Sequence, residues 1–257
     1  MKLPKHIFGI NTEEALARYL AESKKDPEPT TEDQLQVTPS NSSMLNPQKY
    51  IILPGRQHGT YSYPDMLVEK ERTLYGKNWQ EAQKALQEDN ACMLTIRQFV
   101  DLVALLQTGN VLEGTGNKLS RPIVNKILED IITLQNPWRG EWLDAKFSLK
   151  GKFLNKKAQI TYHRIEKRKL QPITEPLEKC LRENKLPGID LEYWLKNATV
   201  HGLPVQNTPA GNLYYWHPQE NCVAWFYAGS IRACLYCDVD PQDSVALLGV
   251  RAARVRV

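Results

Sequence analysis

Val223–Cys237, with the sequence VAWFYAGSIRACLYC, alternates between two sets of side chains. One set is small or apolar and shifts by one residue in the middle: Ala224, Phe226, Ala228 and Ser230, then Ala233, Leu235 and Cys237. The other set has no common size, charge or polarity: Trp225, Tyr227, Gly229, Ile231 or Arg232, Cys234, Tyr236 and Asp238. Successive side chains of a β-strand point to opposite faces, so the pattern predicts strands with the first set inward and the second outward. The one-residue shift indicates a bulge or a turn.

The outward set has the composition of a binding face, because Trp, Tyr and Arg are the residue types enriched at interface hot spots. Tyr214 and Trp216 precede the stretch and extend this face, and Asp240 follows it. Alternatively, these aromatic side chains cover a core in an irregular, loop-rich region. The residue pattern alone leaves both interpretations open.

Capping signatures predict helices before the C-terminal stretch. Asn78 with Glu81, and Thr95 with Gln98, form two capping boxes, and Ser120 with Pro122 begins a third helix. Two shorter helices are predicted over about 174–184, starting at Thr174 and Pro176, and over 190–198, opened by Asp190. Strands are expected at Tyr50-Ile-Ile-Leu and, around a turn at Gly151, at 142–147 and 158–163.

Residues 1–47 differ in composition from the rest and predict an N-terminal arm. Asn11 and Glu14 form a capping signature, followed by a short apolar stripe that favours a helix over about 11–24. The Pro-, Ser- and Asp-rich segments that follow are typical of a linker. The arm is either an attachment tail or a surface segment folded on the main domain, which we place at 48–257.

Composition excludes several classes of protein. The 257 residues are 42% hydrophobic and 24% charged, values that allow a buried core and exclude disorder of the whole chain. No apolar run approaches the length of a membrane span, and the N-terminus lacks the apolar core of a signal peptide, so we expect cytoplasmic synthesis without membrane insertion. Five scattered cysteines and no export signal favour free thiols in a reducing compartment.

A basic segment at 146–170 contains nine Lys or Arg residues and the single acidic residue Glu166. Such a patch could bind phosphates, as a nucleic-acid site does. However, the cations lie on both faces of the predicted hairpin, without a recognition helix or a stacking platform. We therefore expect a solvated hairpin tip and no nucleic-acid partner.

Cys234-Leu-Tyr-Cys237 has the C-x-x-C spacing of zinc and dithiol sites. A zinc site needs a second pair of ligands, and a redox pair favours an adjacent helix start. Neither follows from the sequence, and strand residues three apart point to opposite faces. We expect no metal site, no catalytic residue and no cofactor; a buried Cys237 with an incidental Cys234 is the simplest interpretation.

The chain ending Leu248-Gly249-Val250-Arg251-Ala252-Ala253-Arg254 resembles the Gly-Phe-Arg-Val-Ala-Arg close of the formylglycine-generating-enzyme branch of the C-type lectin fold. Trp79-Gln80-Glu81-Ala82 is similar to the Trp-x-x-Ala helix of that fold, and Met93–Phe99 to its Leu-Pro-Thr-x-x-Glu-Trp helix entry, without the Pro. The resemblance implies an α+β, C-type lectin-like fold of this subtype over residues 48–257. It also leaves an alternative function, an oxidoreductase that uses Cys234 and Cys237. We also expect Arg251 to be partly buried and hydrogen-bonded, because it precedes an apolar chain end.

Another group with this fold and ending, the variable proteins of diversity-generating retroelements, resembles the chain more closely in its two-phase C-terminal stretch. In that group, mutagenic reverse transcription rewrites a C-terminal segment, here about 211–248. The resemblance implies a non-enzymatic ligand-binding display protein, with an unidentified protein or surface ligand as its partner. The sequence does not define the oligomeric state. The expected ligand-binding positions are Tyr214, Trp216, Trp225, Tyr227, Gly229, Ile231, Arg232, Cys234, Tyr236, Asp238 and Asp240.

Overall fold

The computed structural model describes residues 6–7, 10–11, 45–151, 157–166 and 169–256, and the chain divides into two units, 1–45 and 46–257. In the first unit, β1 (His6–Ile7) pairs with β2 (Ile10–Asn11) in an antiparallel register. The helix predicted over about 11–24 lies outside the described residues, apart from Asn11, which belongs to β2. The second unit contains the elements discussed below.

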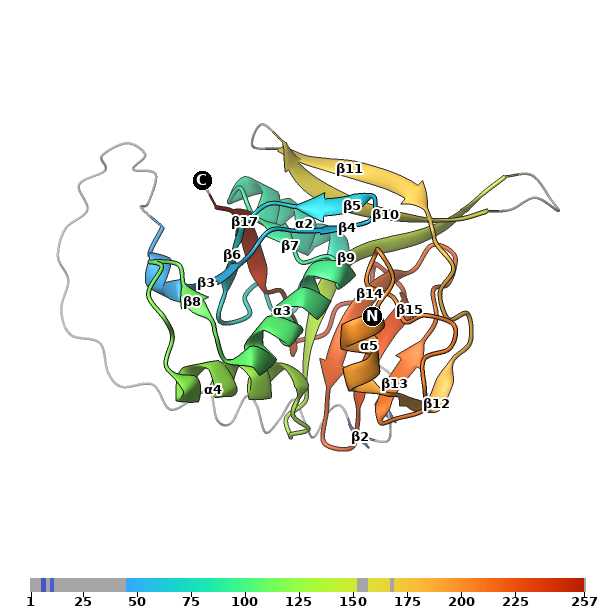
Figure 1. Ribbon diagram of the computed structural model, residues 1–257. Coiled ribbons are helices and arrows are strands. Elements are labelled where there is room, and N and C mark those ends of the chain that lie inside the picture. The colour runs from blue at the N-terminus through green and yellow to red at the C-terminus, as the bar shows by residue number, and fades with distance from the viewer. Residues whose placement is uncertain (1–5, 8–9, 12–44, 152–156, 167–168, 257) are drawn as a thin grey trace. The chain divides into compact units, whose positions relative to one another are not determined.

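The larger sheet of the second unit has eight strands in the order β11-β10-β9-β14-β15-β13-β12, and β16 pairs with β9. The β13–β15 and β16–β9 pairs are parallel and the remaining pairs are antiparallel. Figure 1 shows the long strands β9 and β10 extending from the body of this sheet. The strand bounds are β9 Arg139–Lys150, β10 Lys157–Glu166, β11 Lys169–Pro176, β12 Lys185–Ile189, β13 Leu213–Trp216, β14 Val223–Ala228, β15 Ala233–Val239 and β16 Leu248–Gly249.

A second sheet joins the two ends of this unit. Its order is β7-β17-β6-β3-β8, so the last strand of the chain lies between strands from the first half of the unit. A separate hairpin consists of β4 (Arg56–His58) and β5 (Tyr61–Tyr63). The bounds in the five-stranded sheet are β3 Tyr50–Leu53, β6 Met66–Glu69, β7 Cys92–Met93, β8 Leu112–Glu113 and β17 Ala252–Val255.

The helices begin where the capping residues predicted them. Asn78 and Thr95 each form a complete capping box, and Asp190 accepts a hydrogen bond from the Tyr193 backbone N–H. Ser120 precedes its helix without a side-chain capping bond, and Pro122 lies in the first turn. The helical elements are the short 3₁₀ helix η1 Pro47–Lys49, α2 Trp79–Glu88, α3 Ile96–Thr108, α4 Arg121–Ile132 and α5 Leu191–Asn197.

The helix predicted over 174–184 is wrong. Lys169–Pro176 forms β11, the edge strand of the larger sheet, and 177–184 contains no helix. The pairing of β11 with β10 places the Thr161 and Thr174 hydroxyls 2.8 Å apart. Pro172 and Pro176 are tolerated because an edge strand has one side free of ladder bonds.

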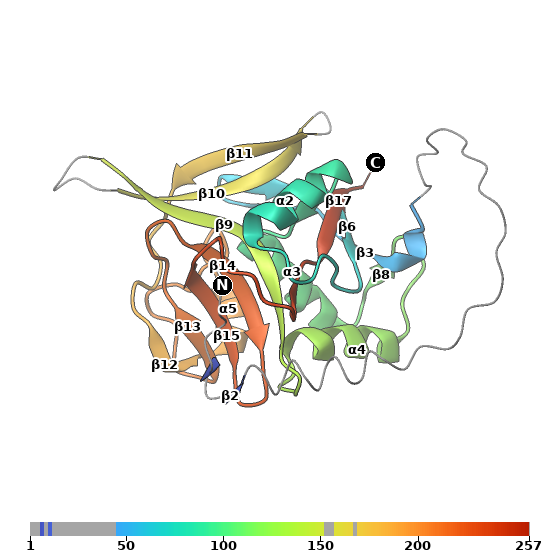
Figure 2. The same ribbon diagram turned by 180° about the vertical axis from the view of Figure 1, so that it is seen from behind.

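Buried side chains form two clusters on either side of the β14–β15 ladder. The larger cluster contains most of α3, whose residues are buried nearly all round, and the inner faces of both sheets. The smaller cluster contains Trp79, Ala82 and Leu86 of α2. Figure 1 shows α3 crossing the middle of the unit, and Figure 2 shows α2 on the opposite side. The α+β class is therefore confirmed. Among the described residues, no helix has the length and apolarity needed to cross a membrane.

Candidate functional site

The two-phase pattern of the C-terminal stretch corresponds to the two faces of β14 and β15. Phe226 and Leu235, which are paired across the ladder, lie in the larger cluster. Their neighbours Trp225 and Tyr236, also paired, lie in the smaller one. The one-residue shift is a turn at 229–232, where the Gly229 N–H donates to the Arg232 carbonyl at 3.0 Å. The predicted alternation is confirmed.

The expectation that the second set faces solvent is wrong for five of its members. Trp225, Tyr227, Gly229, Cys234 and Tyr236 are buried. The reason is that apolar side chains from distant parts of the chain cover this face, including residues of α2, β7 and the segment before β17. No local pattern in 223–237 could reveal that cover.

Aromatic rings form a continuous layer on the covered face. Trp142 of β9 lies 5.4 Å from Trp225, and Trp225 lies 5.7 Å from Tyr236 in an edge-to-face arrangement. Tyr236 in turn stacks on Trp216 at 5.8 Å, with an interplanar angle of 12°. Each such ring pair adds about 0.5–1.5 kcal/mol of stabilisation beyond that of its buried area, so the rings hold one another in place.

The remaining predicted positions form what we call the rim of this layer: Tyr214, Trp216, Ile231, Arg232, Asp238 and Asp240. Tyr214 and Trp216 are half-buried, and the Ile231 side chain is 79% exposed in the turn. The Arg232 guanidinium lies over the Tyr214 ring at 5.2 Å. Asp238 is half-buried, and this burial raises the pKa of its carboxyl, whereas Asp240 is exposed.

Sequence reasoning missed the contribution of β9 to the aromatic layer. Trp138 is half-buried and lies 5.2 Å from Tyr227, and Trp142 is buried. Trp138 directly precedes β9, and the period-two spacing of Trp138, Gly140 and Trp142 continues the strand alternation, so both tryptophans reach the same cluster. That period-two pattern could have indicated the layer, but it would not have shown which strand pairs with β9.

Cys234 and Cys237 lie on opposite faces of β15. Both are buried and unbonded, Cys234 in the smaller cluster and Cys237 in the larger. Burial raises the pKa of Cys234 to about 11 and that of Cys237 well above its ordinary value, so neither thiol is an activated thiolate. Strand residues three apart are separated by about 10 Å, beyond disulfide reach. Within the described ranges, no three His, Cys, Asp or Glu side chains are grouped so as to hold a metal ion.

Arg251 anchors the C-terminal segment to the rest of the domain. Its side chain is buried and donates to Glu141 Oε2 at 3.2 Å, to Asp130 Oδ2 at 3.3 Å and to the backbone carbonyls of Glu69 and Lys70. The expected hydrogen bonding is confirmed, although burial is complete rather than partial. These bonds connect the residue directly before β17 to β9, to α4 and to the C-terminal end of β6.

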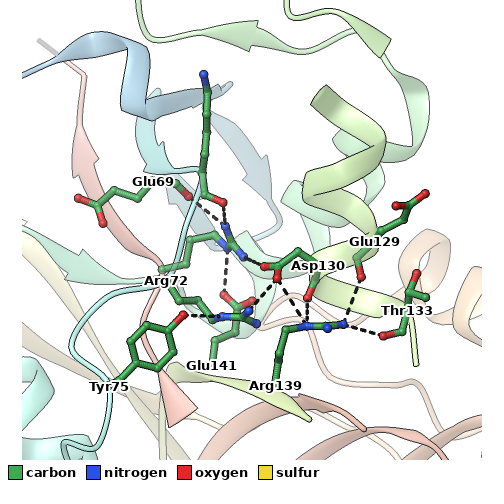
Figure 3. A network of polar contacts seen from close by, with 10 residues as sticks. Glu69, Arg72, Tyr75, Glu129, Asp130, Thr133, Arg139 and Glu141 are labelled. Carbon is green, nitrogen blue, oxygen red and sulfur yellow. Dashed lines mark hydrogen bonds and ion pairs between the residues drawn. The ribbon is translucent and has the colours of Figure 1, made fainter. Parts of the chain in front are cut away.

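Two further arginines complete this network around α4 (Figure 3). Arg72 donates to Asp130 Oδ1 at 2.9 Å, and Arg139 donates to the carbonyls of Asp130 and Thr133, each at 2.8 Å. The Arg139 contacts satisfy carbonyls at the C-terminal end of α4, where a cation also complements the helix dipole. The network thus fixes β9, which carries Trp142 of the aromatic layer and directly follows Trp138, against the rest of the domain.

No family model matches the chain, and neither the curated proteins nor the solved structures contain a match.

Proposed function

We propose that this chain is a ligand-binding display protein whose contact surface is the rim and whose rim codons are diversified by mutagenic reverse transcription. The finer fold assignment, a C-type lectin-like domain of the formylglycine-generating-enzyme subtype, belongs to the same proposal. Its support is the chain ending and the two helix-start motifs that resemble this fold.

The observation that carries the proposal is the contrast between the rim and the layer beneath it. The layer is buried and held by ring contacts from β9, β14 and β15, whereas Ile231 and Asp240 are exposed and Tyr214, Trp216 and Arg232 are half-buried. A rigid support with changeable side chains at its edge suits a binding surface, because ordering the contact residues then costs little entropy.

The rim composition fits recognition of a protein or another large surface. Tyr214 and Trp216 offer flat amphipathic area, Ile231 an apolar tip, and Arg232 and Asp240 opposite charges. The alternative oxidoreductase finds no support in the geometry of Cys234 and Cys237, whose thiols diverge and are buried.

Deep sequencing of codons 211–248 in a natural population tests the proposal. Five rim residues have at least one codon that can arise from an Asn codon by adenine changes alone: Tyr214, Ile231, Arg232, Asp238 and Asp240. We expect substitutions to concentrate there, while Phe226 and Leu235 stay fixed. Uniform codons, or changes spread equally over rim and core, would remove the proposal.

A further inference from the structure

A pocket of about 270 Å³, whose lining contains none of the rim residues, lies between α2 and the β10–β11 pair. Figure 2 shows α2 running beside these two strands. Trp79 and three glutamines of α2 form one wall, with Lys84 beside them, and residues of β10 and β11 form the other. The lining residues are Trp79, Gln80, Gln83, Lys84, Gln87, His163, Leu170 and Pro172.

A buried carboxylate behind the pocket holds His163 in position. Asp144, fully buried on β9, accepts the His163 backbone N–H at 2.6 Å and faces Nδ1 of its ring at 2.9 Å. It also accepts Gln83 Nε2 at 2.7 Å. Burial opposes protonation of His163, but its hydrogen bond to Asp144 and the charge of that group outweigh the burial, so the pKa of the imidazole is raised. The ring is thereby oriented as an Nδ1–H donor to a carboxylate, as in many functional dyads.

Two polar atoms at the pocket remain without a partner among the described residues. His163 Nε2 makes no hydrogen bond there, because both contacts of its ring use Nδ1. Gln83 is only 8% exposed, and its Oε1 atom is buried without a hydrogen-bond partner. An unsatisfied buried acceptor costs about 1–3 kcal/mol, and a small shift of Gln83 toward the pocket would let a ligand donor satisfy it.

Charge and shape define the rest of the ligand. The lining contains Lys84 and His163 and no carboxylate, which favours an anionic group. Trp79 offers a fixed ring, because its Nε1 donates to the Leu143 carbonyl at 3.0 Å, and Leu170 and Pro172 add apolar surface opposite. A flat apolar portion fits between such walls.

We propose that this pocket binds a small organic carboxylate that also carries a hydroxyl or amino group. The carboxylate accepts a hydrogen bond from Nε2–H of the protonated His163 ring and pairs with Lys84, and the carbon skeleton lies against Trp79. A small shift of the Gln83 side chain toward the pocket lets the hydroxyl or amino group donate to its Oε1. This site shares no residue with the rim and does not depend on the function proposed for the rim.

Isothermal titration calorimetry with 4-hydroxybenzoate tests the site, because this rigid probe carries a carboxylate, a ring and a hydroxyl. We expect one saturable site, with 4-hydroxybenzyl alcohol and inorganic phosphate each at least about tenfold weaker, since one lacks the charge and the other the ring. Absence of binding at about 10 mM probe would overturn the proposal, as would phosphate binding at least as tightly as the benzoate.

Matched variants assign the binding to this pocket. Lys84 is exposed, so Lys84→Glu keeps the fold and should weaken 4-hydroxybenzoate about tenfold or more. Lys126→Glu makes the same change on the exposed face of α4 and should leave the affinity unchanged. His163→Gln should weaken binding similarly, with folding checked by urea denaturation. Equal affinity in the wild type and Lys84→Glu would place the probe elsewhere and overturn the assignment.

Discussion

His201 is a single buried residue on which two carboxylates converge. Its Nδ1 lies 2.6 Å from Glu178 and its Nε2 2.8 Å from Glu175, and its side chain is 5% exposed. Both ring nitrogens therefore act as donors, which only the imidazolium can do. Burial lowers the pKa of His201, but the two glutamates outweigh it and raise the value above the ordinary 6.5.

The raised pKa of His201 predicts a pH-dependent stability with a definite sign. A histidine that binds its proton more tightly when folded stabilises the native state fully below pH 6.5 and loses that contribution as the pH rises through its folded pKa. The stability difference between the wild type and His201→Gln, measured by urea denaturation, should therefore shrink with rising pH. His217→Gln is the control, because burial lowers the pKa of His217 and its contribution has the opposite sign. A constant His201 difference would contradict the prediction.

Phe226 and Ile231 are only five residues apart, yet truncation to alanine should lower stability greatly at the first and hardly at the second. Phe226 is 2% exposed and its ring lies 4.8 Å from that of Phe99, so Phe226→Ala leaves a cavity and should cost about 3–5 kcal/mol. Ile231 is 79% exposed, and Ile231→Ala should change stability by no more than about 0.5 kcal/mol. Urea denaturation of the two variants compares them directly. Equal losses would show that the two faces of this stretch are assigned wrongly.

At the scale of elements, local signals predicted the helices and failed where pairing is non-local. Asn78, Thr95 and Asp190 mark helix starts because each side chain accepts a hydrogen bond from the first turn. Thr174 and Pro176 carry a similar local signature, yet they belong to β11, because the ladder with β10 stabilises the extended backbone. No sequence window around 174 contains its partner Thr161.

The two N-cap residues Asn78 and Ser120 give a prediction about helix starts. Asn78→Ala removes the side-chain oxygen that accepts the Glu81 backbone N–H. The reciprocal bond, in which the Asn78 backbone N–H donates to the Glu81 carboxylate, depends on the same geometry, so the variant should lose about 0.5–2 kcal/mol of stability. Ser120 makes no capping bond in α4, so Ser120→Ala should cost clearly less. Thermal unfolding monitored by circular dichroism measures both. A larger loss for Ser120 would contradict the hydrogen bonding described for these two helices.

At the scale of the whole molecule, the sequence predicted the two faces of the C-terminal strands but not their cover. Alternation is a property of one strand, so Phe226 and Trp225 could be assigned to opposite faces from residues 223–237 alone. The burial of Trp225 depends on side chains that are distant in sequence, such as Trp79 and Leu248. The His163–Asp144 pair was missed for the same reason, because it joins two strands across the sheet.

The separation of rim from support predicts that the rim tolerates combined change. The triple variant Ile231→Ser, Arg232→Ser and Asp240→Asn alters exposed or half-buried positions, each worth about 0.5 kcal/mol or less, so Tm should fall by no more than about 5 °C. Trp225→Ala, a single change in the buried layer, should cost about 3–5 kcal/mol and lower Tm more than the triple variant does. Calorimetry of the two proteins decides between a changeable edge on a fixed support and one uniformly packed structure. In the second case the triple variant would unfold at the lower temperature, and the rim could not accept diversification without loss of the fold.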